Sequence, residues 1–123
     1  MTKILVVDDE IDVCDFVKHF FEERNFRTFT ALSGKEALRM LKKEKPDIIL
    51  LDIRMKEMDG IETLKRIREI DKDVKVIMVT AVNDQDKMEI CRELGASKYV
   101  TKPLVLEELE KVVSSYIKKD KNA

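Results

Sequence analysis

Three short stretches of this chain are apolar at every position, and this feature restricts its fold most strongly. They are Ile4–Val7, Ile48–Leu51 and Val76–Val79, with the length and β-branched content of strands. A strand with one face in water alternates apolar and polar residues, whereas a continuously apolar strand is buried on both faces. A parallel sheet covered by helices on both sides meets that requirement. Two weaker runs, Phe26–Ala31 and Tyr99–Thr101, are predicted to complete the sheet.

Amphipathic helical patterns fill the segments between these runs. The first has apolar residues at the spacing of one helix face, namely Val13, Phe16, Val17, Phe20 and Phe21. Residues that favour helix N-termini precede later patterns, in capping-box form at Ser33–Glu36, at Asp59, and at Asn83 or Asp84. Gly95 is predicted to end the fourth helix. Strand and helix thus alternate five times, which predicts an α/β fold with a doubly wound five-stranded parallel sheet, (βα)5.

The bulk composition limits the classes of function. The chain has 123 residues, enough for one domain with its own core, and 24 basic against 25 acidic residues give a net charge of −1. No global basic field therefore favours nucleic acid or an anionic membrane. Cys14 and Cys91 are too few and too far apart for a disulfide framework. Since no signal-peptide pattern or membrane-length apolar segment occurs, we expect a cytoplasmic protein with two reduced thiols.

Polar residues follow the carboxyl ends of four predicted strands. Asp8 and Asp9 follow the first strand and Asp52 follows the third. Thr80 ends the fourth, and Lys102 comes directly after the fifth. In an open α/β sheet, ligands bind in the crevice outside these ends, so the side chains are expected to converge. Clustered carboxylates suit a hard cation such as Mg²⁺. A carboxylate beside such a cation can accept a phosphoryl group whose charge an ammonium and a hydroxyl neutralise.

Each of these residues also has a purely structural interpretation. Asp8 and Asp9 suit the positive end of a helix dipole. Asp52 alone is compatible with a turn, and Thr80 or Lys102 alone indicates nothing specific. Their shared position at one edge of the sheet is what favours a phosphoryl-accepting site.

The order of the motifs resembles the receiver domain of two-component response regulators, the family of the chemotaxis protein CheY. The motifs are Ile4–Glu10, Asp47–Met55, Met58–Gly60, Val79–Ala81, Gly95–Ala96 and Lys102–Pro103. The resemblance extends over residues 1–118 and leaves residues 119–123 as a polar C-terminal tail. It implies the flavodoxin- and CheY-like strand order 2-1-3-4-5, which periodicity alone does not give.

The resemblance implies a role for each residue at the sheet edge. Asp52 would be the phosphoacceptor. Mg²⁺, or Mn²⁺, would be bound by Asp9 directly, by Asp8 mainly through water, by Asp52, and by the backbone carbonyl of Arg54. Thr80 would bond a phosphoryl oxygen.

Further implied roles concern the switch that reports phosphorylation. Lys102 would pair with the phosphoryl group, and its bond to Pro103 would be cis. Tyr99 would be the switch aromatic, turning inward as Thr80 moves toward the phosphate. A bistable loop and ring would thus respond to a new local charge. The output face would comprise residues 88–92, Tyr99 and the helix from Leu106.

The resemblance also implies partners. The phosphoryl donor would be a sensor histidine kinase or a phosphotransfer protein, and the signal would pass to a downstream protein or output domain, with a homodimer through the output face left open. Neither nucleic acid nor a membrane is expected to bind directly. Two alternatives are an interaction domain that is never phosphorylated and a Mg²⁺-dependent aspartyl phosphatase. Such phosphatases need an acid two residues after the nucleophile, where this chain has Arg54. We therefore expect no enzyme beyond one that catalyses its own phosphorylation and dephosphorylation.

Several positions depart from the family pattern. Lys56 stands where many relatives have proline, and Val105 where they often have a helix-capping Ser or Asp. Burial of Leu104 and Val105 under their loop is the favoured interpretation, and an exposed apolar docking patch is the alternative. Arg54 and Val82 flank the expected mouth of the site, at two variable positions that influence hydrolysis of the acyl phosphate in the family that the chain resembles. A long arginine and an apolar valine could restrict attacking water, so we expect a phosphoryl lifetime longer than that of a fast chemotaxis-type regulator.

The single histidine, His19, is interpreted as a surface residue of the first helix. A donor histidine normally lies in a dedicated helical transfer domain, and this chain has none of that pattern. The pairing with a kinase is expected to depend on the surface of the same helix, including Asp12, Asp15 and His19.

Overall fold

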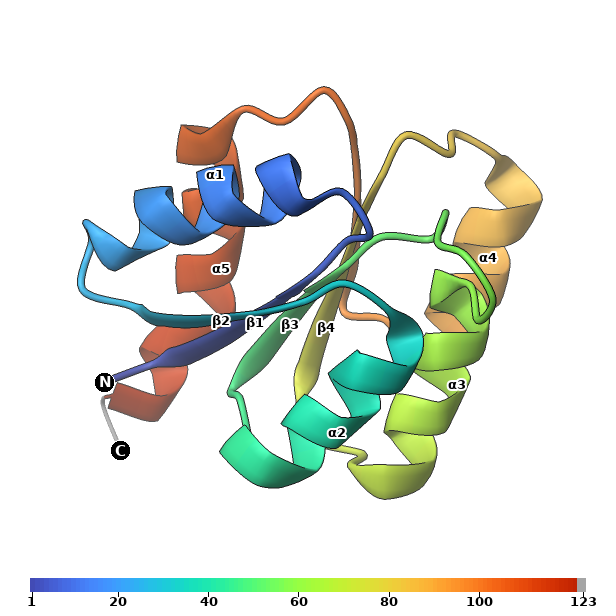
Figure 1. Ribbon diagram of the computed structural model, residues 1–123, viewed down its shortest axis with the longest axis horizontal. Coiled ribbons are helices and arrows are strands. Elements are labelled where there is room, and N and C mark those ends of the chain that lie inside the picture. Colours follow the sequence, from blue (N-terminus) through green and yellow to red (C-terminus); the bar gives the residue numbers. More distant parts are fainter. Residues whose placement is uncertain (122–123) are drawn as a thin grey trace.

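The computed structural model, which describes residues 1–121, contains one parallel five-stranded sheet between two layers of helices (Figure 1). The strands are β1 (Lys3–Val7), β2 (Arg27–Ala31), β3 (Ile48–Leu51), β4 (Lys75–Thr80) and β5 (Lys98–Thr101). They lie in the order β2-β1-β3-β4-β5 and all neighbours pair in parallel. The predicted fold class and strand order are therefore confirmed.

Helices cover both faces of the sheet. They are α1 (Ile11–Glu22), α2 (Gly34–Glu44), α3 (Gly60–Ile70), α4 (Gln85–Glu93) and α5 (Leu106–Lys121). Helices α1 and α5 cover one face, and α2, α3 and α4 cover the other (Figure 1). Helix α5 continues to Lys121, so the expected start of the tail at residue 119 falls within this helix. Asn122 and Ala123 of that tail lie outside the described residues.

The continuously apolar strands fill two cores at once. In β1, Ile4 and Val6 face α1 and α5, while Leu5 and Val7 face the other helical layer. These side chains are at most 4% exposed. Successive strand residues point to opposite faces, so both sets must be apolar when both faces are covered.

Helix caps form largely where the sequence predicts them. The carboxylate of Asp59 accepts the Glu62 N–H at 2.9 Å, and Asp84, rather than Asn83, caps α4. The Ser33 hydroxyl accepts the Glu36 N–H at 3.1 Å. The second half of this capping box differs from the standard form, because the Glu36 carboxylate accepts the N–H of Leu32, at 2.8 Å.

One expectation about burial is wrong, that of Val105, and one member of the apolar stripe of α1 is exposed. Phe16 is 58% exposed, so the buried stripe of α1 is narrower than its apolar pattern. Val105 is 55% exposed, although its neighbour Leu104 is half-buried beside Val13 and Val17. The loop before α5 covers one of these two side chains and leaves the other in solvent. Within residues 1–121, no helix has both the length and the apolar character needed to cross a bilayer.

Candidate functional site

The sheet brings the predicted residues to one edge because its strands pair in register. Val7 lies opposite Leu51, and Leu51 lies opposite Met78, so β1, β3 and β4 end at a similar height. Hydrogen bonds continue past the strand end, since the Asp52 N–H donates to the Val7 carbonyl at 3.0 Å. The Lys102 N–H donates likewise to the Thr80 carbonyl at 2.8 Å.

A buried ion-pair cluster occupies this edge. The Lys102 ammonium donates to Asp8 Oδ2 at 2.9 Å and to Asp52 Oδ2 at 3.3 Å. Asp8 is 3% exposed, Asp52 is 6% exposed and Thr80 is fully buried. Charged groups are rarely buried without partners. One ammonium therefore stabilises two carboxylates that lie 44 positions apart in the sequence.

The pKa shifts in the cluster follow from burial and from the presence of two carboxylates beside one ammonium. Burial raises the pKa of Asp8, and the negative charge of Asp52 adds to this; hydrogen bonds from Lys102 and from the Glu10 N–H oppose it. Burial alone would lower the pKa of Lys102, but its hydrogen bond to Asp8 and the charges of both carboxylates raise it overall. The lysine is thus held as a cation, and a second positive charge would relieve the remaining repulsion.

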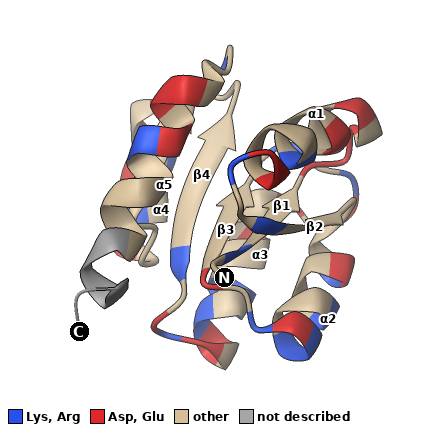
Figure 2. Ribbon diagram, turned by 90° about the vertical axis from the view of Figure 1, so that its left-hand side faces the viewer, with Lys and Arg blue, Asp and Glu red and all other residues tan. Residues whose placement is uncertain are grey.

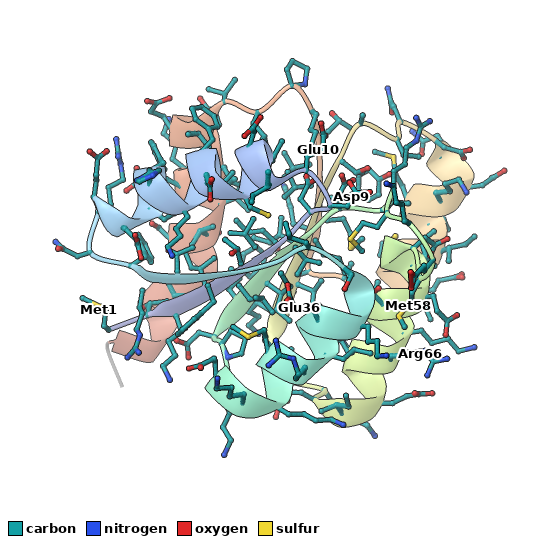
Figure 3. All side chains as sticks on the ribbon, in the orientation of Figure 1. Met1, Asp9, Glu10, Glu36, Met58 and Arg66 are labelled. Carbon is teal, nitrogen blue, oxygen red and sulfur yellow. The ribbon has the colours of Figure 1, made fainter. Side chains whose placement is uncertain are left out.

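A cleft of about 690 Å³ opens beside this cluster. Asp9 and Arg54 line it, together with Ala81 and Val82 from the end of β4. Figure 3 shows Asp9 in the connection between β1 and α1, at the edge of the sheet. The Arg54 N–H donates to Asp52 Oδ1 at 3.3 Å, which ties the cleft wall to the carboxylate. Arg54 and Val82 therefore both lie in the wall of this cleft.

The donor set fits a magnesium ion with few protein ligands. Among the described side chains of residues 1–117, no group of three or more acidic, His or Cys residues is arranged to hold a metal ion by itself. Mg²⁺ needs only one or two carboxylates, because it keeps several waters and takes phosphate oxygens as ligands. Asp8 and Asp52 supply buried carboxylates that share one ammonium, and Asp9 lies at the adjoining cleft. These oxygen donors are compatible with a magnesium ion that keeps most of its waters.

Thr80 and Tyr99 are connected through one residue, Val82. The Thr80 hydroxyl oxygen accepts the Val82 N–H at 3.2 Å, and the Tyr99 hydroxyl donates to the Val82 carbonyl at 2.5 Å. Tyr99 is half-buried and packs against the core on the α4 side. The sequence indicated Val82 only as a neighbour of the mouth, because a backbone bridge has no side-chain signature. The Lys102–Pro103 bond is cis, as the family resemblance implies.

Gly60, which the sequence analysis named only as part of the Met58–Gly60 motif, is a further contributor to the site. Its N–H donates to the Ile53 carbonyl at 2.7 Å. A Cβ atom at this position would overlap the backbone carbonyl oxygen of Asp52. Glycine is therefore required for α3 to begin against the strand end that carries Asp52. An Asp-Gly dipeptide such as Asp59-Gly60 is typical of a turn, and it does not by itself indicate this close approach.

The remaining histidine and cysteines lie apart from this cluster. His19 is exposed on α1, which agrees with its interpretation as a surface residue. Cys14 and Cys91 are buried free thiols, as expected. Cys14 nevertheless contacts the site indirectly, because its Sγ lies 3.3 Å from the backbone carbonyl oxygen of Asp8.

Known proteins resemble this chain in sequence over most of its own length. The chain is 38% identical over 115 residues to sporulation initiation phosphotransferase F of Bacillus subtilis, covering 94% of this chain and 93% of that protein. It is 35% identical to the transcriptional regulatory protein PhoP of the same organism, but spans only 50% of it. The chain thus matches one relative over nearly all its length and the other over half.

Solved structures agree with these sequence relatives. Chemotaxis protein CheY4 of Vibrio cholerae superposes with a TM-score of 0.90 at 30% identity, covering 94% of this chain and 98% of that one. A CheX–CheY–BeF3–Mg²⁺ complex from Borrelia burgdorferi gives 0.88 at 33% identity, covering 93% and 87%. The sequence model of the protein family described as response regulator receiver domain matches residues 4–114 of this chain. With the parallel sheet and the acidic cluster at its edge, this match shows that the chain belongs to the response regulator receiver domain family of two-component signalling.

Proposed function

We propose that this domain is a phosphorylation switch in which Asp52 accepts a phosphoryl group and the change is transmitted to the face formed by α4, β5 and α5. The observation that carries the proposal is the buried cluster of Asp8, Asp52 and Lys102 at the carboxyl edge of the sheet. A fold does not require two buried carboxylates on one ammonium, since such a cluster costs desolvation energy. It does suit a carboxylate that must receive a highly charged group.

The transfer step is a nucleophilic displacement at phosphorus. A carboxylate oxygen of Asp52 attacks the phosphorus of a phosphohistidine in the donor protein, forming an O–P bond and an acyl phosphate. The P–N bond breaks, its electron pair stays on the imidazole of the donor, and solvent supplies the proton. Lys102, already 3.3 Å from Asp52, pairs with the incoming charge, and the Thr80 hydroxyl bonds a phosphoryl oxygen.

The metal that this reaction needs would be Mg²⁺ or Mn²⁺. Asp9, Asp8, Asp52 and the backbone carbonyl of Arg54 are the residues we propose to hold it. When bound, such an ion neutralises part of the phosphoryl charge. The CheX–CheY relative from Borrelia burgdorferi contains Mg²⁺ together with BeF3, which supports a divalent metal in this family.

The switch would use the connection through Val82. When the Thr80 hydroxyl turns toward the phosphoryl group, it ceases to accept the Val82 N–H. Tyr99, which holds the Val82 carbonyl, then changes its position together with this loop. A groove of about 200 Å³ between α4 and β5, lined in part by Met88 and Tyr99, would change shape with it. This face is where we place a downstream protein, an output domain or a second copy of the chain.

The donor protein would bind over α1. Ile11 and Phe16 are each 58% exposed there, and Val105 of the adjoining loop is 55% exposed. Figure 2 shows acidic segments on the same helix. A sensor histidine kinase or a phosphotransfer protein is the proposed donor. The relative named a phosphotransferase in sporulation initiation supports an intermediate role, in which Asp52 passes its phosphoryl group on to another protein.

The decisive experiment is intact-mass analysis after incubation with Mg²⁺ and acetyl phosphate. We expect one phosphoryl adduct on the protein, its loss in Asp52→Asn, and its retention in Asp47→Asn. Asp47 is a matched control because it lies at the opposite end of β3, where its carboxylate accepts the Lys3 N–H. An adduct that survives in Asp52→Asn would reject this acceptor, and its absence from the wild type would favour an interaction domain that is never phosphorylated. Sustained release of phosphate from esters would favour the phosphatase alternative.

A further inference from the structure

Helix α4 is weakly anchored to the rest of the domain. Its nine residues include one that is fully buried, Cys91, whereas α1, α2 and α3 each bury three or more. Ile90 is 43% exposed, and the groove of about 200 Å³ borders the helix on the β5 side. Figure 1 shows α4 at the edge of the molecule, beside α3. With so little burial, the bonds at the two ends of this helix determine its position.

A guanidinium from α3 binds the turn at the C-terminal end of α4, which is also bonded to β4 through Ser97 and Val76. Arg68, in the last turn of α3, donates from Nε and Nη2 to the Gly95 carbonyl at 3.2 and 2.7 Å. Its Nη1 donates to the carbonyl oxygens of Asp71 and Val74, at 3.1 and 2.7 Å. One side chain thus joins α3, the loop that enters β4 and the turn that follows α4. Hydrogen bonds from a charged donor are stronger than neutral ones.

The turn after α4 is shaped to receive this guanidinium. Gly95 has a φ of +96°, a conformation that side-chain-bearing residues rarely adopt. A Cβ atom at this position would lie 2.9 Å from Arg68 Nε. Glycine is therefore needed twice, for the turn itself and for the approach of the arginine. The sequence pattern indicated only the first of these reasons.

The N-terminal end of α4 is held by a different set of bonds. Val82 precedes the helix, and its N–H and carbonyl are bonded to Thr80 and Tyr99 respectively. Thr80 is the proposed phosphoryl ligand, so a change at Asp52 reaches this end of α4 first. The opposite end is bound to Arg68. The N-terminal end of α4 is therefore positioned through Val82 and the C-terminal end through Arg68, so the two ends can move independently.

We propose that Arg68 is a positioning residue that fixes the C-terminal end of α4 while phosphorylation displaces its N-terminal end, so that the helix pivots at Gly95. This inference rests on the proposed function for its phosphorylation step. Without the guanidinium, α4 loses the link between its C-terminal turn and α3, and keeps there the bonds between Ser97 and Val76 of β4. It then opens more readily in the unphosphorylated protein, and phosphorylation shifts the whole helix instead of one end.

Amide hydrogen exchange measured by mass spectrometry tests the proposal in Arg68→Met. Arg66→Met is the matched control, since Arg66 lies on the same helix, points away from α4 and pairs with Glu62 (Figure 3). In the unphosphorylated protein, exchange over residues 85–97 should rise roughly ten- to hundredfold in Arg68→Met, the effect of losing one charged hydrogen bond. Exchange over residues 11–22 should be unchanged, and the control should match the wild type throughout.

The same measurement after treatment with Mg²⁺ and acetyl phosphate tests the pivot. In the wild type, exchange should change over residues 82–89 and stay constant over 94–97, whereas in Arg68→Met the change should extend to 94–97. If Arg68→Met does not fold, Arg68→Lys takes its place, because lysine keeps the charge but cannot span all three carbonyl oxygens.

Three results would overturn parts of this inference. Unchanged exchange over residues 85–97 in the unphosphorylated variant would show that Arg68 does not anchor α4. An equal spread of the phosphorylation effect in wild type and variant would reject the pivot. Absence of the phosphoryl adduct in the wild type, measured by intact mass on the same samples, would refute the proposed function and the pivot with it. The unphosphorylated comparison would still decide whether Arg68 anchors the helix.

Discussion

Removal of the Lys102 ammonium should destabilise the domain strongly. At an effective dielectric constant of about 20, its contacts with Asp8 at 2.9 Å and Asp52 at 3.3 Å correspond to about 6 and about 5 kcal/mol of attraction. Most of this offsets the cost of burying the three charges. Breaking a buried pair by removing one partner typically costs about 3–5 kcal/mol, because the other charge stays buried. We expect a loss of this size in Lys102→Met, from a total of roughly 6–18 kcal/mol for a domain this large.

Urea unfolding at pH 7.5 measures this loss of unfolding free energy. In thermal unfolding the same loss should appear as a melting temperature lower by roughly 10–20 °C. Lys111→Met is the control, since its ammonium lies 3.8 Å from Glu108 on an exposed surface and should contribute less than about 0.5 kcal/mol. The pKa of Lys102 is raised in the folded state, so its contribution is complete below its ordinary pKa of 10.5. This contribution is lost as the pH rises through the pKa of Lys102 in the folded protein. The difference in unfolding free energy between wild type and variant should therefore narrow only at that high pH.

Two further measurements separate this explanation from a general packing defect. Asp52→Asn, added to Lys102→Met, should recover stability because it removes one of the two unpaired carboxylates. Millimolar Mg²⁺ should raise the melting temperature of Lys102→Met more than that of the wild type, where the ammonium competes with the ion for Asp8 and Asp52. A loss below about 1 kcal/mol, or a recovery by neither Asp52→Asn nor Mg²⁺, would refute the electrostatic reasoning.

Three further changes have simple expected outcomes. Thr28 is 3% exposed and its Oγ1 has no hydrogen-bond partner among the described side chains of residues 1–117 or the described backbone, so Thr28→Val should stabilise the domain by about 1 kcal/mol in urea unfolding; a destabilised variant would contradict this. Lys45 ends α2 at a φ of +49°, so Lys45→Gly should stabilise by about 0.5–1 kcal/mol, and a loss of stability would contradict the assigned strain. Burial raises the pKa of Cys14 to about 11, so iodoacetamide at pH 8 should modify it only in denaturant. For the same reason stability should fall as the pH rises from 9 toward 11, and rapid native alkylation would contradict the burial.

The sheet and the members of its site were predictable because both depend on local sequence. Continuous apolar runs require a sheet covered on both faces, and the residue after each run must then lie at the carboxyl edge. Asp8, Asp52 and Thr80 follow directly from that rule. The strand order came from family resemblance, since the same alternation of strands and helices is compatible with other orders.

The errors arose where an apolar pattern exceeds the surface that can cover it. Phe16 fits the helical spacing of α1, yet it lies about 160° around the helix from Cys14, which faces the sheet. The sheet and α5 cover a narrower arc, so this ring is in solvent. Val105 is exposed for a related reason. The side chain of a loop residue can point either inward, as Leu104 does, or outward, as Val105 does. The spacing of apolar residues predicts which face of a helix is buried, but not how wide an arc of that helix its neighbours cover.

The bonds that link the site to its surroundings were invisible to the sequence for another reason. They join backbone groups to distant side chains, as in the contacts of Tyr99 with Val82 and of Arg68 with Gly95. A carbonyl acceptor occurs at every residue, so no pattern marks the one that is used. The acidic residues could be identified from the sequence because burying carboxylates at the edge of a sheet costs free energy, which indicates a functional role. If the proposed switch is correct, the backbone bonds that transmit its signal therefore require a structure. The residues that perform the chemistry, and Tyr99 itself, are indicated by the sequence and its family resemblance.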